Sequence, residues 1–121
     1  MRVSRPSEVT EEPFDAPHFS GAVTRRDHGS IEAPAGTVLL VRFPAGVRTH
    51  WHRHPDGQVL YVTDGSGRVG TRDGRVESVT PGDVIYAPPD EEHWHGAAES
   101  EGVQHLALSF GATDWMEPVT D

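Results

Sequence analysis

The chain has 121 residues, enough for one domain with a core of its own, and its hydrophobic fraction of 35% is low. The formal charge of −9 argues against a nucleic-acid-binding protein, and the absence of cysteine and lysine excludes disulfides, thiolate metal sites and Schiff-base chemistry on a lysine. No apolar run approaches the ~18 residues of a membrane-spanning helix, and residues 1–6 lack the apolar stretch of a signal peptide, so we expect a cytoplasmic protein.

Ten prolines and thirteen glycines divide the chain into short apolar runs, which is typical of strands joined by turns. Residues 1–18 are polar and acidic, and we expect an N-terminal arm in which His18 is a surface residue. Residues 19–111 are predicted to form a single barrel or sandwich of about nine strands. Residues 112–121 are predicted to be a C-terminal tail, anchored only through Trp115 and Met116.

Turn residues separate the predicted strands closely. Residues 26–30 are expected to form a turn after the first strand, and Asp73-Gly74 predicts a two-residue hairpin. Tyr86 is assigned to the core of its strand. The predicted strands cover residues 19–25, 37–43, 50–54, 58–63, 68–72, 75–79, 84–87, a segment beginning at 93, and 103–110.

Two His-x-His segments give the strongest chemical signal. His50, His52 and His54 share one face of an extended strand, and His93 and His95 share a face of another. Imidazoles from such pairs can bind one metal ion. Several unpaired imidazoles inside a barrel would be costly, so the pattern favours a metal site over a polar strand face without metal.

An amide follows the first histidine segment. Gln58 comes after the turn at residues 55–57 and alternates with Leu60 and Val62, so its side chain is predicted to point inward. Neutral imidazoles and an amide suit Mn, Fe, Co, Ni or Zn. A neutral amide leaves the full dipositive charge of the ion in place, which favours Lewis-acid chemistry over redox cycling.

The spacing around the first histidine segment resembles the first motif of the cupins, small β-barrels of the jelly-roll type. That motif reads Gly, five residues, His-x-His, three or four residues, Glu, six residues, Gly. This chain has Gly46, His52, His54, Gln58 and Gly65 at the corresponding positions. The one departure is the amide in place of the glutamate.

The second cupin motif also has a counterpart. It reads Gly, five residues, Pro-x-Gly, two residues, His, three residues, Asn, and this chain has Gly82, Pro88, Asp90, His93 and Ala97 there. Asp90 replaces the second glycine and Ala97 replaces the asparagine. With both motifs in register, the resemblance implies an all-β fold, the cupin double-stranded β-helix or jelly-roll barrel.

A narrower resemblance exists within that family. The run Trp-His-x-His-Pro-x-Gly-Gln, the later His-Trp-His-Gly and a histidine on the last strand are similar to small bacterial cupins that include the manganese-dependent hydroxynitrile lyases. The resemblance implies one divalent metal per chain, with Mn first and Fe, Ni, Co or Zn as alternatives. The ligands that it implies are His52, His54, Gln58 and His93, and the last-strand histidine, in the position of the catalytic residue, is His105.

The roles of other histidines stay open. His50 and His52 are a competing ligand pair, but their spacing fits the motif worse, and we expect His50 at the outer end of its strand. His95 is a second catalytic candidate, or else a barrel histidine satisfied by hydrogen bonds. His105 is either a catalytic base or a buried histidine bonded to a neighbour.

We therefore expect a metal-dependent cupin enzyme acting on a small hydroxy or carbonyl compound, with a Lewis-acid metal and a histidine base. The alternatives are a cupin dioxygenase or isomerase, or a non-catalytic cupin that binds metal or a small ligand. An open metal position facing a pocket lined by His105, Leu39 and Val41 would favour catalysis. We expect a homodimer, a small-molecule substrate, and no nucleic-acid or membrane partner.

Overall fold

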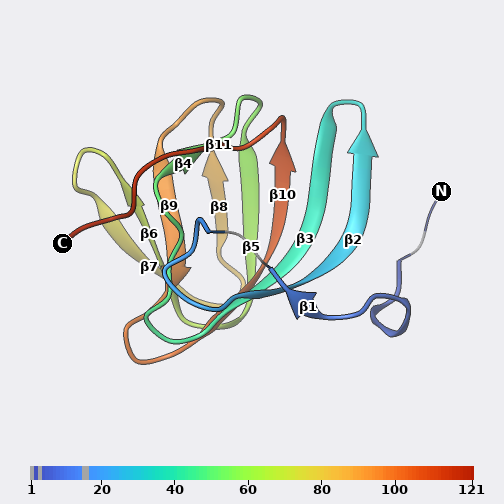
Figure 1. Ribbon diagram of the computed structural model, residues 1–121, viewed down its shortest axis with the longest axis horizontal. Helices are drawn as coiled ribbons and strands as arrows, with labels where there is room; N and C mark the ends of the chain where they lie inside the picture. Colours follow the sequence, from blue (N-terminus) through green and yellow to red (C-terminus); the bar gives the residue numbers. More distant parts are fainter. Residues whose placement is uncertain (1, 3, 15–16) are drawn as a thin grey trace.

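In a computed structural model, which describes residues 2, 4–14 and 17–121, the regular secondary structure is almost entirely β-strand, arranged in two antiparallel sheets (Figure 1). The six-stranded sheet contains β1 (Glu12–Pro13), β2 (Thr24–Glu32), β3 (Ala35–Phe43), β10 (Val103–Phe110), β5 (Gln58–Gly65) and β8 (Val84–Ala87), in that order. The five-stranded sheet contains β11 (Asp114–Trp115), β4 (His52–Arg53), β9 (His93–Ala97), β6 (Gly67–Thr71) and β7 (Val76–Val79), in that order. The prediction of an all-β barrel is confirmed.

The core lies between the sheets and is built by alternation along the strands. In β10 every second side chain from Val103 to Ser109 is buried, because neighbouring residues of a strand point to opposite faces. β10 pairs with both β3 and β5, so Val62 and Phe43, each 1% exposed, pack in the same layer. Gln58 is 4% exposed on the face of β5 that carries Val62, as predicted.

The first predicted strand and the turn after it were placed wrongly. β2 begins only at Thr24 and continues through residues 26–30, where the register shifts between Asp27 and Ser30. Gly29 has φ of +111°, and its N–H donates to Asp27 Oδ1 over 2.8 Å. The residues that are typical of a turn therefore form a bulge inside the strand.

Two further details differ from the expectation. β4 contains only His52 and Arg53, so the histidine segment is a short strand and not one of five residues. Tyr86 is 62% exposed on β8 and does not belong to the core, because the alternation buries its neighbour Ala87.

Both ends of the chain add strands to the sheets. The predicted arm contains a 3-10 helix, η1 (Pro6–Glu8), and β1, which pairs with β2 at the edge of the larger sheet. Positions 1, 3, 15 and 16 of that arm lie outside the described residues. The predicted tail contains β11, which pairs with β4. Within the described ranges, helical structure is too short to cross a membrane.

Candidate metal centre

The fold brings together residues that lie far apart in the sequence. His52 on β4 and His93 on β9 are direct partners across the five-stranded sheet, while Gln58 opens β5 in the other sheet. Each of the predicted site residues is buried, with exposed fractions of 1% to 6%. They are His52, His54, Gln58, His93, His95 and His105.

Among the residues that the structure describes, the potential metal donors that lie close together are three histidines. One ring nitrogen from each of His52, His93 and His95 lies within 4.8 Å of the others. The ring of His54 is beside this group, with its centroid 5.0 Å from that of His52 and 5.6 Å from that of His93. His50, the competing candidate, precedes β4 and contributes its backbone carbonyl to the site.

Hydrogen bonds at Nδ1 fix two of the imidazoles. His52 Nδ1 donates to the carbonyl oxygen of His50 over 2.9 Å, and His93 Nδ1 donates to that of Glu91 over 2.9 Å. A carbonyl oxygen can only accept, so both rings carry their proton at Nδ1 and keep the Nε2 lone pair free. This is how metal-binding histidines are usually oriented by a second partner.

Two features of the histidine cluster fit a bound cation. Gln58 Nε2 donates to Ser109 Oγ over 2.9 Å, which turns Oε1 toward His93 Nε2 at 3.0 Å. Both facing atoms then present lone pairs, and a positive ion between them would relieve that unfavourable contact. Among the described residues, the buried His54 Nε2 also has no hydrogen-bond partner. The donor set therefore fits a divalent transition metal.

Burial keeps these histidines neutral. Desolvation, followed by repulsion from the neighbouring His93, lowers the pKa of His54 to about 4. Desolvation, followed by repulsion from other histidines, holds the pKa of His52 and of His95 well below the usual range. A neutral imidazole is the form that binds metals and accepts protons.

His95, one of the three histidines of this donor group, forms a pair with His105. His105 Nε2 lies 3.2 Å from His95 Nδ1, so one of the two nitrogens donates to the other. Burial lowers the pKa of His105 to about 4. His105 is thus a buried, neutral histidine hydrogen-bonded to His95, and through His95 it is connected to the donor group.

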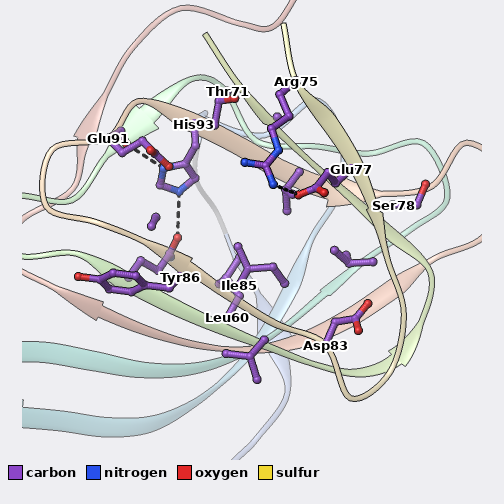
Figure 2. Close-up of a pocket in the computed structure, with 16 residues that line it drawn as sticks. Leu60, Thr71, Arg75, Glu77, Ser78, Asp83, Ile85, Tyr86, Glu91 and His93 are labelled. Carbon is purple, nitrogen blue, oxygen red and sulfur yellow. Dashed lines mark hydrogen bonds and ion pairs between the residues drawn. The ribbon is translucent and has the colours of Figure 1, made fainter. Parts of the chain in front are cut away.

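A cavity of about 410 Å³ reaches the site between the two sheets (Figure 2). Gln58 and His93 are among its lining residues, and Leu60 and Ile85 give it an apolar wall. The ion pair between Arg75 and Glu77, with a distance of 2.7 Å, also lines it. The described lining residues include neither of the paired histidines nor the β3 side chains that the sequence pointed to.

Three polar or aromatic neighbours of the site were missed in the sequence. Ser109 could have been found, since it shares a strand face with His105 and its register partner is Gln58. Thr113, whose Oγ1 lies 3.3 Å from His54 Nδ1, carries no local signal, and Trp115, packed against His52, was predicted only as an anchor of the tail.

The comparisons with known proteins agree on the family. A family model described as "Cupin domain" matches residues 39–109. The chain is 51% identical over 128 residues to the (R)-mandelonitrile lyase of Granulicella tundricola, an alignment that covers 100% of this chain and 96% of that protein.

Solved structures show the same fold. A cupin-like protein from Thermotoga maritima superposes with a TM-score of 0.84 at 36% identity, over 90% of this chain and 86% of that one. A polyketide cyclase from Streptomyces resistomycificus gives a TM-score of 0.79 at 22% identity, over 100% and 87% of the two chains, a likeness in fold alone. By its motifs, its two sheets and these matches, the chain belongs to the cupin family.

Proposed function

We propose that this cupin is a metal-dependent lyase that cleaves cyanohydrins into a carbonyl compound and hydrogen cyanide. The observation that carries the proposal is the buried histidine cluster in which a neutral His95 is hydrogen-bonded to a neutral His105. The identity of 51% to a mandelonitrile lyase, spread over the whole chain, supports the same chemistry.

The proposed ligands of the metal are His52, His54, Gln58 and His93. The unpartnered Nε2 of His54 and the facing acceptors of Gln58 and His93 support this set over one that includes His95. Bound there, a divalent ion would act as a Lewis acid toward a substrate oxygen. Manganese is the metal that we propose, on the likeness to the manganese-dependent lyases.

The histidine pair supplies the base. The hydroxyl proton of the cyanohydrin passes to His95, whose ring nitrogen lies within 4.8 Å of that of His93 on the cavity lining, and His105 shares that proton through the 3.2 Å contact. The carbon–carbon bond to the nitrile then breaks as the carbonyl forms, and the departing cyanide takes the proton to give hydrogen cyanide. Both rings start neutral, because burial lowers the pKa of each.

The cavity between the sheets is the proposed substrate pocket. Its volume of about 410 Å³ lies within the range of small-molecule sites, which is roughly 300–1,000 Å³. Leu60 and Ile85 offer an apolar surface for the substituent of the substrate, while its hydroxyl reaches toward Gln58 and His93. Since Arg75 pairs with Glu77, the acidic side chains of Asp83 and Glu91 leave the lining with a net negative charge, which favours a neutral substrate over a carboxylate.

Turnover of mandelonitrile, with and without added Mn²⁺, tests the proposal directly. We expect metal-dependent release of benzaldehyde, and a loss of roughly 10²–10⁴-fold in His105→Ala with the metal retained. Because the pKa of His105 is about 4, the rate is expected to rise with pH above that value and then to level off. Absence of turnover with any cyanohydrin would leave a cupin dioxygenase, an isomerase or a ligand-binding protein.

A further inference from the structure

The C-terminal segment 113–117 runs along the strand that carries the first proposed ligand. In β11, Trp115 is the register partner of His52 and Asp114 that of Arg53. The backbone pairing continues beyond the strand, since Met116 N–H donates to the carbonyl oxygen of Trp51 over 2.8 Å. Without this segment, β4 would be the edge of its sheet.

Side chains of the segment touch two of the four proposed ligands. The indole ring of Trp115 lies with its centroid 4.7 Å from the ring of His52. The indole in turn stacks on His18 at 4.6 Å, with the two ring planes 3° apart. Thr113 Oγ1 lies 3.3 Å from His54 Nδ1 and can accept its proton.

The ring of His54 is held by a residue of the tail, whereas the rings of His52 and His93 are held by their own segments. His52 and His93 are anchored at Nδ1 by carbonyl oxygens two residues away in their own segments. The described partner of His54 Nδ1 is Thr113, a residue 59 positions away. Outer partners of this kind orient a ligand and typically affect metal affinity 10- to 100-fold.

We propose that the segment 113–117 is a clamp that holds the rings of His52 and His54 in their metal-binding orientation and sets how long the metal stays bound. This inference rests on the proposed metal site. Ion pairs fasten the clamp at its ends: Arg53 to Asp114 at 2.9 Å and Arg72 to Glu117 at 2.9 Å.

The rate of metal loss to an excess of a colorimetric chelator tests the clamp. We expect Thr113→Val and Trp115→Ala to release Mn²⁺ roughly 10- to 100-fold faster than the parent protein. Thr120→Val, an exposed position in the same tail, is the matched control and is expected to leave the rate unchanged. Trp115→Phe, which keeps an aromatic face, is expected to restore most of the retention.

Melting temperatures of the metal-free variants distinguish two roles of the segment: retaining the metal, or only stabilising the edge of the sheet. If Trp115→Ala lowered the metal-free melting temperature while Thr113→Val and Trp115→Ala released metal at the parent rate, the clamp would be refuted. If Trp115→Ala does not fold, the rate of metal release from the near-isosteric variant Thr113→Val tests the clamp by itself. A parent protein that binds no metal would refute the proposed metal site itself, an outcome distinct from unchanged release rates.

Discussion

A histidine buried among other histidines binds a proton poorly. Desolvation lowers the pKa of His52, and the neighbouring His93 and His54 lower it further, since a second positive charge nearby would be repelled. The same burial keeps His95 and His105 neutral, which is the protonation state that the proposed metal site and the proposed base both require.

Removal of a proposed ligand is expected to reduce metal content. His52→Ala and His93→Ala should each lose most of the bound metal and melt at a lower temperature, because a metal bound only by the folded state stabilises it. Elemental analysis of protein purified without a histidine tag measures the first effect and calorimetry the second. His28→Ala, on β2 and outside the cluster, is the control and should change neither quantity.

The metal content of two variants decides whether His54 or His95 is a ligand. We expect His54→Ala to lose metal and His95→Ala to keep it while losing activity. The reverse result would make His52, His93 and His95, the tightest donor group, the metal site.

Gln58→Glu is expected to keep the metal and change its redox behaviour. A carboxylate binds a divalent ion at least as well as an amide and stabilises the trivalent state, so the reduction potential should fall. Ser109 Oγ accepts from Gln58 Nε2 in the parent protein, and its hydroxyl can donate instead to a carboxylate at that position. Voltammetry of the metal-loaded variant measures the potential, and loss of the metal would show that Gln58 is only a hydrogen-bonding residue.

At the scale of elements, the loop between β8 and β9 delivers His93 to the site. Asp90 has φ of +67°, and its N–H donates to the carbonyl oxygen of His54 over 2.9 Å. The loop is therefore tied to a second proposed ligand. Asp90 occupies a glycine position of the second cupin motif, and the left-handed backbone explains why glycine suits that position.

The conformation at Asp90 predicts opposite effects of two substitutions. Asp90→Gly should leave the free energy of unfolding unchanged or slightly higher, since glycine adopts positive φ without strain. Asp90→Val should lower it by about 1–2 kcal/mol, because a branched side chain is strained there. Urea denaturation of both variants measures the difference, and equal stabilities would contradict the left-handed assignment.

For the whole molecule, the buried histidines link stability to pH. In the folded protein the pKa of His54 and that of His105 are about 4, below the usual value of 6.5. Between these values the unfolded chain binds more protons than the folded one, so the free energy of unfolding falls as the pH falls from about 6.5 to about 4. Each such histidine contributes at most about 1.4 kcal/mol per pH unit.

Urea denaturation of the metal-free protein at pH 7, 6 and 5 measures this slope. Metal-free protein is needed because protons also compete with a metal for the same nitrogens. His105→Phe removes one titrating group from the core and is expected to show a shallower slope. A slope equal to that of the parent protein would mean that His105 does not titrate with a lowered pKa.

The outer side of the larger sheet bears on the oligomeric state. Tyr61, Val84 and Tyr86 are 44%, 63% and 62% exposed on paired strands β5 and β8, and β8 is the last strand of its sheet. An exposed apolar patch at a sheet edge is typical of an interface. We expect a homodimer that buries this patch. Light scattering should show that Tyr86→Asp shifts the protein toward the monomer, whereas Thr120→Asp in the tail leaves the dimer intact.

The features predicted correctly from the sequence depend on local patterns, namely turn residues and the alternation of side chains along a strand. Turn residues delimited β3, β5 and β10 because glycine and proline restrict the backbone within a few residues of themselves. Alternation with Leu60 and Val62 correctly placed Gln58 inside the barrel, since the period of two is a property of any strand. Alternation failed for Tyr86, whose outward direction depends on which face of β8 the rest of the barrel covers.

By itself, the sequence determined the fold family, the short strands and the set of polar side chains available to a metal, because motif spacing and strand period act over a few residues. Only the tertiary structure decided which of them meet. His105 bonds to His95, and Thr113 and Trp115 reach His54 and His52, across contacts that no spacing along the chain encodes. Such contacts follow from sheet order and register, which depend on the packing of the whole chain.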